Sequence, residues 1–267
     1  MGEYVQIGDV KTWYDTAGSG DPVVLLHGGL VTNDTWAQQI PAIAERFAVY
    51  APERRAHGHT PDVDGPLTYR EMAADTIGFL EAVVPGPAHL VGWSDGGIVA
   101  LLVAAARPDL VRKVVAISAN TDTEPGTLVE GAAEALGDNP DDPSLEMFRG
   151  LYAASSPDGA GHWPVAFAKI LAMIEEGPAI TADELATITA RTLIVSGDDD
   201  LLTLEHTIAI YRAIANSELA VVPGTSHALV FEKADLLNRI VLDFVSNDAV
   251  PTMMPFRRAA SAPARAV

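Results

Sequence analysis

The sequence contains no cysteine among its 267 residues, which excludes disulfides, thiolate metal sites and cysteine nucleophiles. Basic residues are also few, with 17 Lys and Arg against 36 Asp and Glu, for a net charge of −19. Such a charge argues against nucleic acid or an anionic membrane as a partner. Residues 1–4 form neither a basic nor an apolar segment, and no run of about 18 apolar residues occurs. We therefore expect a soluble, cytoplasmic protein.

Hydrophobic residues make up 48% of the chain, an ordinary share for a globular protein, and many lie in short apolar runs. The runs predict strands at residues 4–7, 10–15, 23–26, 48–51, 89–91, 111–118, 192–196 and 219–222. Helical patterns occur at residues 35–46, 68–83, 98–106, 203–213 and 233–246. Strands that alternate with helices imply a mostly parallel sheet with right-handed crossovers, so the sequence predicts an α/β fold.

The sequence Gly-Trp-Ser-Asp-Gly at residues 92–96 lies between an apolar run and a helical pattern. A nucleophile on a sharp turn from strand to helix has strained backbone, and small flanking residues let the two chain segments pass closely. Ser94 is therefore a candidate nucleophile. The helix that follows has free N–H groups at its first turn, and we expect the Asp95 N–H to stabilise a developing oxyanion.

A serine nucleophile needs a histidine base and a carboxylate that orients the base, expected here in the order Ser, Asp, His. Three consecutive aspartates at 198–200 follow the strand at 192–196, and His227 follows the strand at 219–222. Ligands of open α/β sheets bind outside the carboxyl ends of the strands. We therefore expect one of these aspartates and His227 to meet Ser94 at that edge.

Residues 27–30, His-Gly-Gly-Leu, follow the strand at 23–26 and provide two glycines where backbone must approach a substrate. We expect the Gly29 N–H to be the second oxyanion donor, with Leu30 as the alternative, and His27 to have a structural role. His57 and His59 have the spacing of metal ligands, but no carboxylate or third histidine accompanies them at ligand spacing. We expect no metal and no cofactor.

With these four motifs in this order, residues 4–246 resemble the α/β-hydrolase-fold enzymes of the cap-bearing esterase and C–C hydrolase group. The resemblance implies a mostly parallel eight-stranded sheet flanked by helices, with a helical cap insertion. Family spacing places the acid two residues after Gly197, which selects Asp199 and leaves Asp198 as the alternative. The family often has glycine where this chain has Ala56, in a loop that borders the expected site.

Residues 120–190 interrupt the alternation, with helical patterns at 127–136, 144–155, 164–176 and 181–187 and no convincing strand. We therefore expect a hydrolase core at 1–119 and 191–247, a helical cap at 120–190, and a flexible C-terminal tail at 248–267. A cap would exclude water and shape the choice of substrate. The candidates for substrate binding are Leu30, Trp93, Asp95, Tyr152, His162, Trp163 and Phe167.

The sequence thus favours a metal-free serine hydrolase that cleaves an ester or related acyl bond of a small molecule. A C–C bond hydrolase or a perhydrolase would use the same residues, and a hydrolase-fold receptor with little turnover is a further alternative. The Asp95 carboxylate either complements the helix dipole or favours a cationic substrate such as an amino-acid ester. The sequence leaves homo-oligomer formation open.

Overall fold

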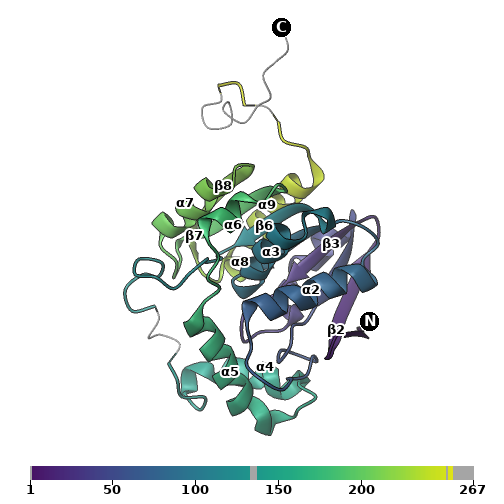
Figure 1. Cartoon of the computed structure of the whole chain (residues 1–267), viewed down its shortest axis with the longest axis vertical. Helices are drawn as coiled ribbons and strands as arrows, with labels where there is room; N and C mark the ends of the chain where they lie inside the picture. Colours follow the sequence, from purple (N-terminus) through teal and green to yellow (C-terminus); the bar gives the residue numbers. More distant parts are fainter. Residues whose placement is uncertain (1, 133–136, 251, 255–267) are drawn as a thin grey trace.

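The computed structural model describes residues 2–132, 137–250 and 252–254, and an eight-stranded sheet forms its centre (Figure 1). The strands are β1 (Glu3–Ile7), β2 (Val10–Gly18), β3 (Asp21–Leu26), β4 (Phe47–Pro52), β5 (Ala88–Trp93), β6 (Val111–Ile117), β7 (Arg191–Asp199) and β8 (Ser217–Ser226). Their order in the sheet is β1-β2-β4-β3-β5-β6-β7-β8. β2 is antiparallel to β1 and β4, and the other neighbouring strands are parallel. The predicted mostly parallel sheet is confirmed.

Helices cover both faces of the sheet (Figure 1). They are α1 (Ile40–Ala44), α2 (Tyr69–Val83), α3 (Asp95–Ala106), α4 (Glu146–Ser155), α5 (Trp163–Glu176), α6 (Ala182–Ala186), α7 (Leu204–Ala213), α8 (Leu229–Glu232) and α9 (Ala234–Ser246). Successive residues of a strand point to opposite faces, so Val24 and Leu26 pack with α2 and α3 while Val23 and Leu25 pack with α1 and α9. Burial on both faces explains why the strands read as continuous apolar runs.

The helix predicted at residues 35–46 is divided in the structure. A 3₁₀ turn, η1 (Asn33–Trp36), begins after Thr32, whose side chain accepts the Asp34 N–H, and α1 follows as a separate short helix. Pro41 lies in the first turn of α1, where its missing N–H costs no intrahelical hydrogen bond. The proline therefore marks a new helix start rather than the middle of a long helix.

The segment 120–190 contains α4, α5 and α6, and α4 and α5 form a lobe below the sheet in Figure 1. The helix predicted at 127–136 is wrong for residues 127–132, which form turns and an isolated bridge between Leu128 and Leu202, and residues 133–136 lie outside the described residues. The Val129 N–H donates to the Leu201 carbonyl at 2.9 Å, and the Thr203 N–H donates to the Thr127 carbonyl at 2.9 Å. These hydrogen bonds between the 127–129 and 201–203 segments use backbone groups that a helix at 127–136 would need for its own hydrogen bonds.

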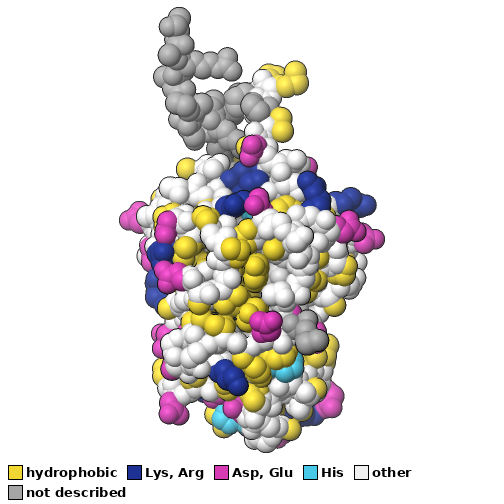
Figure 2. All heavy atoms as spheres, turned by 90° about the vertical axis from the view of Figure 1, so that its right-hand side faces the viewer, with side chains coloured by type: hydrophobic (Ala, Val, Ile, Leu, Met, Phe, Trp, Pro, Cys, Tyr) yellow, Lys and Arg dark blue, Asp and Glu magenta, His cyan; other side chains and the backbone are white. Residues whose placement is uncertain are grey.

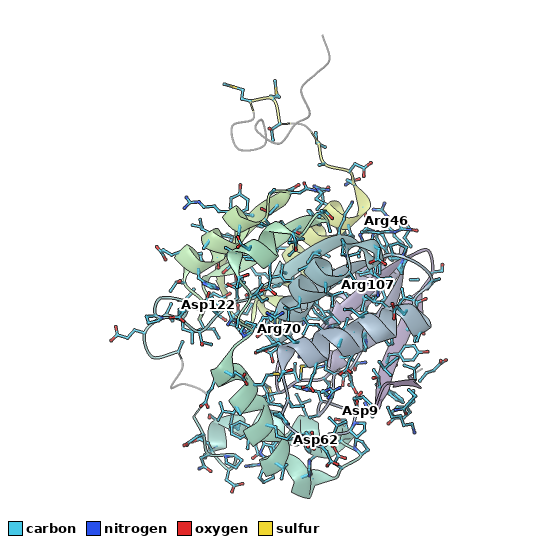
Figure 3. The ribbon with its side chains drawn as sticks, in the orientation of Figure 1. Asp9, Arg46, Asp62, Arg70, Arg107 and Asp122 are labelled. Atoms are coloured by element: carbon cyan, nitrogen blue, oxygen red, sulfur yellow. The ribbon has the colours of Figure 1, made fainter. Side chains whose placement is uncertain are left out.

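Asp62 joins the α4–α5 lobe to the rest of the protein (Figure 3). One of its carboxylate oxygens accepts Lys169 Nζ at 2.5 Å, and the other lies 2.9 Å from His162 Nε2. Burial raises the pKa of Asp62, but the hydrogen bonds from Lys169 and His162 outweigh it and lower the pKa below its usual range. The ionised carboxylate thus holds the start of α5 against the loop after β4.

Acidic side chains are spread over the face shown in Figure 2, and hydrophobic side chains gather over its middle. In the described part of the chain, no helix combines the length and the apolar character needed to span a membrane. Of the predicted tail, residues 251 and 255–267 lie outside the described residues, and residues 248–250 and 252–254 form no helix or strand.

Candidate active site

Ser94 lies on the turn between β5 and α3, in strained backbone with φ 54° and ψ −123°. A side chain at Gly92 would collide with the backbone of Gly96, and one at Gly96 would collide with the backbone of Leu26. The Ser94 N–H donates to the Ile117 carbonyl at 2.8 Å, which ties the turn to β6. Close packing on both sides therefore holds a conformation that would cost an unsupported serine about 1–3 kcal/mol.

His227 connects Ser94 to a buried carboxylate. Its Nε2 lies 3.0 Å from Ser94 Oγ, and its Nδ1 lies 2.8 Å from Asp200 Oδ1. A carboxylate only accepts hydrogen bonds, so Nδ1 carries the proton and Nε2 is free to accept the serine proton. The expected meeting of Ser94, His227 and an aspartate is present, but the aspartate is Asp200.

The expectation of Asp199 as the acid is wrong, and so is its alternative Asp198. Both side chains are exposed, and Asp198 accepts the Thr225 N–H at 3.1 Å. β7 continues to Asp199, where the pairing with β8 shifts register, so the chain turns inward one residue later than family spacing implies. Only Asp200 of the three is buried, with 7% of its surface exposed.

Asp200 is surrounded by donors. Its Oδ2 accepts Ser118 Oγ at 2.5 Å and the Gly197 N–H at 3.3 Å, and its Oδ1 also accepts the Leu202 N–H at 3.3 Å. Burial raises the pKa of Asp200, but the hydrogen bond and charge of His227, together with Ser118, lower it below its usual range. Asp200 is therefore a fixed anion beside His227 at neutral pH.

The two expected oxyanion donors belong to Asp95, the residue after Ser94, and to Gly29, where an added Cβ would lie 2.6 Å from Asp95 Oδ2. Within the described residues, neither the Gly29 N–H nor the Asp95 N–H has a hydrogen-bond acceptor in the protein. Leu30, the alternative to Gly29, donates its N–H to His57 Nε2 at 3.1 Å and is not free to bind a substrate oxygen. The structure therefore leaves Gly29 and Asp95 as the candidates.

His27 and His57 support this region as neutral rings. Burial, followed by the charge of Arg54, lowers the pKa of His27 well below its usual value and the pKa of His57 to about 3. His57 Nδ1 lies 2.9 Å from the Arg55 carbonyl, so this ring links the 54–58 loop to Leu30. The expected structural role of His27 is confirmed, because its Nε2 accepts the Arg54 N–H at 3.1 Å.

The Asp95 carboxylate is buried, with 5% of the residue exposed. Its Oδ1 accepts the Tyr69 hydroxyl at 2.8 Å, and its Oδ2 lies 2.6 Å from the position that a Cβ on Gly29 would take. Its charge also acts on the buried guanidinium of Arg54. The carboxylate thus lies beneath the 27–30 loop, among groups of the protein itself.

The other candidates for substrate binding lie in different surroundings. Leu30, Tyr152 and Trp163 line a cavity of about 10 Å³ between the 27–30 loop and α5, which is about the space of one water. Phe167 is buried against Trp163, with ring centroids 5.3 Å apart, and does not line this cavity. His162 faces Asp62 rather than the cavity.

Trp93 has a supporting role that the sequence did not reveal. Its Nε1 donates to the His227 carbonyl at 2.8 Å, so the residue before the nucleophile fixes the backbone of the candidate base. Ser118, Tyr69 and Arg54 were likewise absent from the predicted site. The only sequence signal that could have pointed to Ser118 and Arg54 is that each follows closely on the end of a strand, β6 for Ser118 and β4 for Arg54.

Comparisons with known proteins agree with the fold. A model of the alpha/beta hydrolase family matches residues 23–240. The serine hydrolase BPHL of Mus musculus is 28% identical over 252 residues, which cover 90% of this chain and 85% of that protein. The non-heme chloroperoxidase of Burkholderia pyrrocinia is 27% identical and covers 91% of this chain and 99% of its own. The chain belongs to the alpha/beta hydrolase family of enzymes.

Solved structures show the same architecture. The meta-cleavage product hydrolase of Pseudomonas fluorescens IP01 matches with a TM-score of 0.77 at 24% identity, covering 91% of this chain and 97% of that chain. A thermophilic esterase of Thermogutta terrifontis matches with a TM-score of 0.73 at 21% identity, covering 91% and 98%. At these identities the likeness concerns the fold, which is the predicted α/β-hydrolase fold.

Proposed function

We propose that the protein is a serine hydrolase that cleaves an ester or a related acyl bond of a small molecule through an acyl-enzyme. The observation that carries the proposal is the chain of contacts from Ser94 Oγ to His227 Nε2 at 3.0 Å and from His227 Nδ1 to Asp200 Oδ1 at 2.8 Å. This arrangement combines a nucleophile, a base and a carboxylate that fixes the tautomer of the base.

In the first half of the reaction, Ser94 Oγ attacks the substrate carbonyl carbon while His227 Nε2 takes the serine proton. The N–H groups of Gly29 and Asp95 stabilise the oxyanion that forms on the carbonyl oxygen. The bond to the leaving group then breaks, and His227 gives its proton to the departing alkoxide. The products of this half are an alcohol and an acyl group bound to Ser94.

In the second half, His227 takes a proton from water as the water oxygen attacks the acyl carbon. The bond to Ser94 Oγ breaks, and the proton returns to the serine, so the enzyme is regenerated with release of a carboxylic acid. Asp200 stays ionised throughout and stabilises the imidazolium that forms in each half. α4 and α5 would act as the cap that limits water and selects the acyl group.

The first test is the burst and the steady state with p-nitrophenyl acetate and p-nitrophenyl butyrate. A burst followed by steady turnover, both lost in Ser94→Ala, supports the acyl-enzyme route. A burst without turnover would favour the hydrolase-fold receptor.

The same samples should be offered a vinylogous diketone and, separately, hydrogen peroxide as the acyl acceptor, because similar proteins include a meta-cleavage product hydrolase and a chloroperoxidase. Faster cleavage of the diketone than of either ester would refute the assignment as an esterase.

A further inference from the structure

Arg54 is a buried cation beside the candidate oxyanion loop, and the proposed mechanism gives it no role. Only 5% of the residue is exposed. Its Nη2 donates to the Gly28 carbonyl at 2.7 Å, and its backbone N–H donates to His27 Nε2 at 3.1 Å. Burial of an arginine is costly unless its charge meets a partner, so a purely incidental position is disfavoured.

Arg54 and His27 together fix the Gly28 carbonyl. Because His27 Nε2 accepts the Arg54 N–H, the ring proton lies on Nδ1, and Nδ1 is 2.7 Å from the Gly28 oxygen. The Gly28 oxygen therefore accepts two hydrogen bonds, one from the ring and one from the guanidinium. The Arg54 bond is the charge-assisted one of the two and hence the stronger.

The orientation of this carbonyl decides where the Gly29 N–H points. A trans peptide unit is planar, with its C=O and N–H on opposite sides, and no cis peptide bond occurs in the described chain. The Gly29 N–H must therefore point away from Arg54 and His27. Ser94 lies beside the same loop, since a Cβ on Gly28 would come within 3.4 Å of the Ser94 Cβ.

The buried Asp95 carboxylate is a negative charge that acts on Arg54. Burial lowers the pKa of Arg54, while the Asp95 carboxylate and Tyr69 raise it. Tyr69 in turn donates to Asp95 Oδ1 at 2.8 Å. The residue that offers one oxyanion donor through its backbone thus acts, through the charge of its side chain, on the arginine that holds the other donor.

We propose that Arg54 is a positioning residue of the oxyanion hole: its guanidinium holds the Gly28 carbonyl and thereby aims the Gly29 N–H at the carbonyl oxygen of the substrate. This role rests on the proposed serine-hydrolase function. Because the oxyanion develops in the transition state, loss of Arg54 lowers kcat and leaves KM nearly unchanged.

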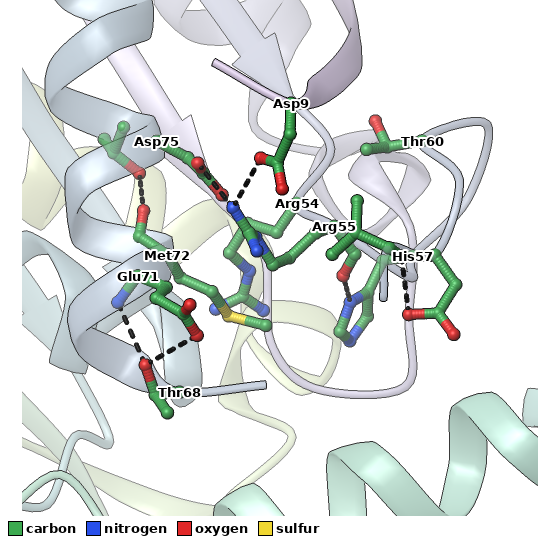
Figure 4. A network of polar contacts seen from close by, with 12 residues as sticks. Asp9, Arg54, Arg55, His57, Thr60, Thr68, Glu71, Met72 and Asp75 are labelled. Carbon is green, nitrogen blue, oxygen red and sulfur yellow. Dashed lines mark hydrogen bonds and ion pairs between the residues drawn. The ribbon is translucent and has the colours of Figure 1, made fainter. Parts of the chain in front are cut away.

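The test compares Arg54→Met with Arg55→Met in the full chain. Arg55 is the matched control, because it is equally buried at 6% exposure but its guanidinium binds Asp9 and Asp75 (Figure 4) instead of the Gly28 carbonyl. Removal of one oxyanion donor costs about 10²- to 10³-fold in kcat, and misaiming it in Arg54→Met should cost about 10-fold to 10²-fold with little change in KM. Arg55→Met should lose thermal stability and keep the parent kcat.

A trifluoromethyl ketone provides a second readout, because it binds serine hydrolases as a tetrahedral adduct with a negatively charged oxygen. Its inhibition constant should weaken in Arg54→Met by the same factor as kcat/KM, which a general loss of stability would not produce. If Arg54→Met does not fold, the double variant with Asp95→Asn removes both buried charges and should restore folding without restoring kcat.

Two results overturn the proposal in distinguishable ways. A folded Arg54→Met or double variant with the parent kcat and the parent affinity for the ketone would overturn the role of Arg54 alone. Absence of turnover that depends on Ser94 in the parent would overturn the proposed function and this role together.

Discussion

Replacement of Asp200 by asparagine tests which carboxylate orients His227. The Oδ2 position faces Ser118 Oγ and the Gly197 N–H, and the Oδ1 position faces His227 Nδ1 and the Leu202 N–H. An amide has one oxygen, and three donors, Ser118 Oγ, Ser196 Oγ and the Gly197 N–H, draw it to the Oδ2 position against the single backbone N–H of Leu202 at Oδ1. The amide NH₂ then faces His227, whose Nδ1 must become the acceptor.

In that state the ring proton lies on Nε2, which can no longer accept the proton of Ser94. A wrong tautomer of this kind lowers kcat by about 10⁴-fold, or about 5.5 kcal/mol in activation free energy. If the amide oxygen instead faced His227, only the charge would be lost, at a cost of about 1.4 kcal/mol or about tenfold. We therefore expect a loss of kcat of at least about tenfold and close to the upper figure.

The assay is steady-state hydrolysis of p-nitrophenyl acetate by the parent, Asp200→Asn and Asp199→Asn, with thermal unfolding of each protein as the check on folding. Asp199 is exposed and has the same chemistry, so Asp199→Asn is the matched control and should keep kcat within about twofold. A large loss in Asp199→Asn together with near-parent activity in Asp200→Asn would refute the reasoning and restore the assignment from family spacing.

Three further predictions concern stability, the acid and the cavity. Burial lowers the pKa of His57 to about 3, so between that value and its usual value of 6.5 only the unfolded state binds the proton, and stability rises with pH. His57 should therefore make the free energy of unfolding in urea about 2 kcal/mol lower at about pH 5 than at about pH 7, and a His57→Gln variant with the full pH slope of the parent would contradict this. Ser118→Ala removes a hydrogen bond to Asp200 and should lower kcat about 5- to 10-fold at constant KM, whereas an unchanged kcat would show that this bond does not position the acid. Ile170→Val widens the small cavity near Leu30 and should lower the free energy of unfolding by about 1 kcal/mol. The wider cavity should raise kcat/KM for the butyrate ester relative to the acetate ester, and a constant ratio would place the acyl group of the substrate elsewhere.

The sequence predicted the fold well because burial on both faces turns each central strand into an apolar run that is visible without coordinates. β3, β5 and β6 are examples, and each lies within a residue or two of its predicted range. Ser94 could also be predicted, because steric collisions at Gly92 and Gly96 allow only glycine there. His227 followed from its place past the last strand.

The acid could not be chosen in this way. The choice among three consecutive aspartates depends on where β7 stops pairing with β8, and the register shift beside Asp199 has no signature in the sequence. The bond from Arg54 to Gly28 joins residues 26 positions apart, and it depends on the packing of two loops. The failed helix at 127–132 has the same origin, since its backbone bonds go to the 201–203 loop.

The residues of the candidate site come from segments spread along almost the whole chain, so the site forms only when the chain has folded completely. Ser94 and His227 are 133 residues apart in sequence, and Asp200 reaches His227 only when the end of β7 is in place. A growing chain on the ribosome therefore contains Ser94 long before His227, its candidate base, has been synthesised. Under the proposed function, turnover should appear only after the last strand has joined the sheet, and a partly synthesised chain should not act on substrate.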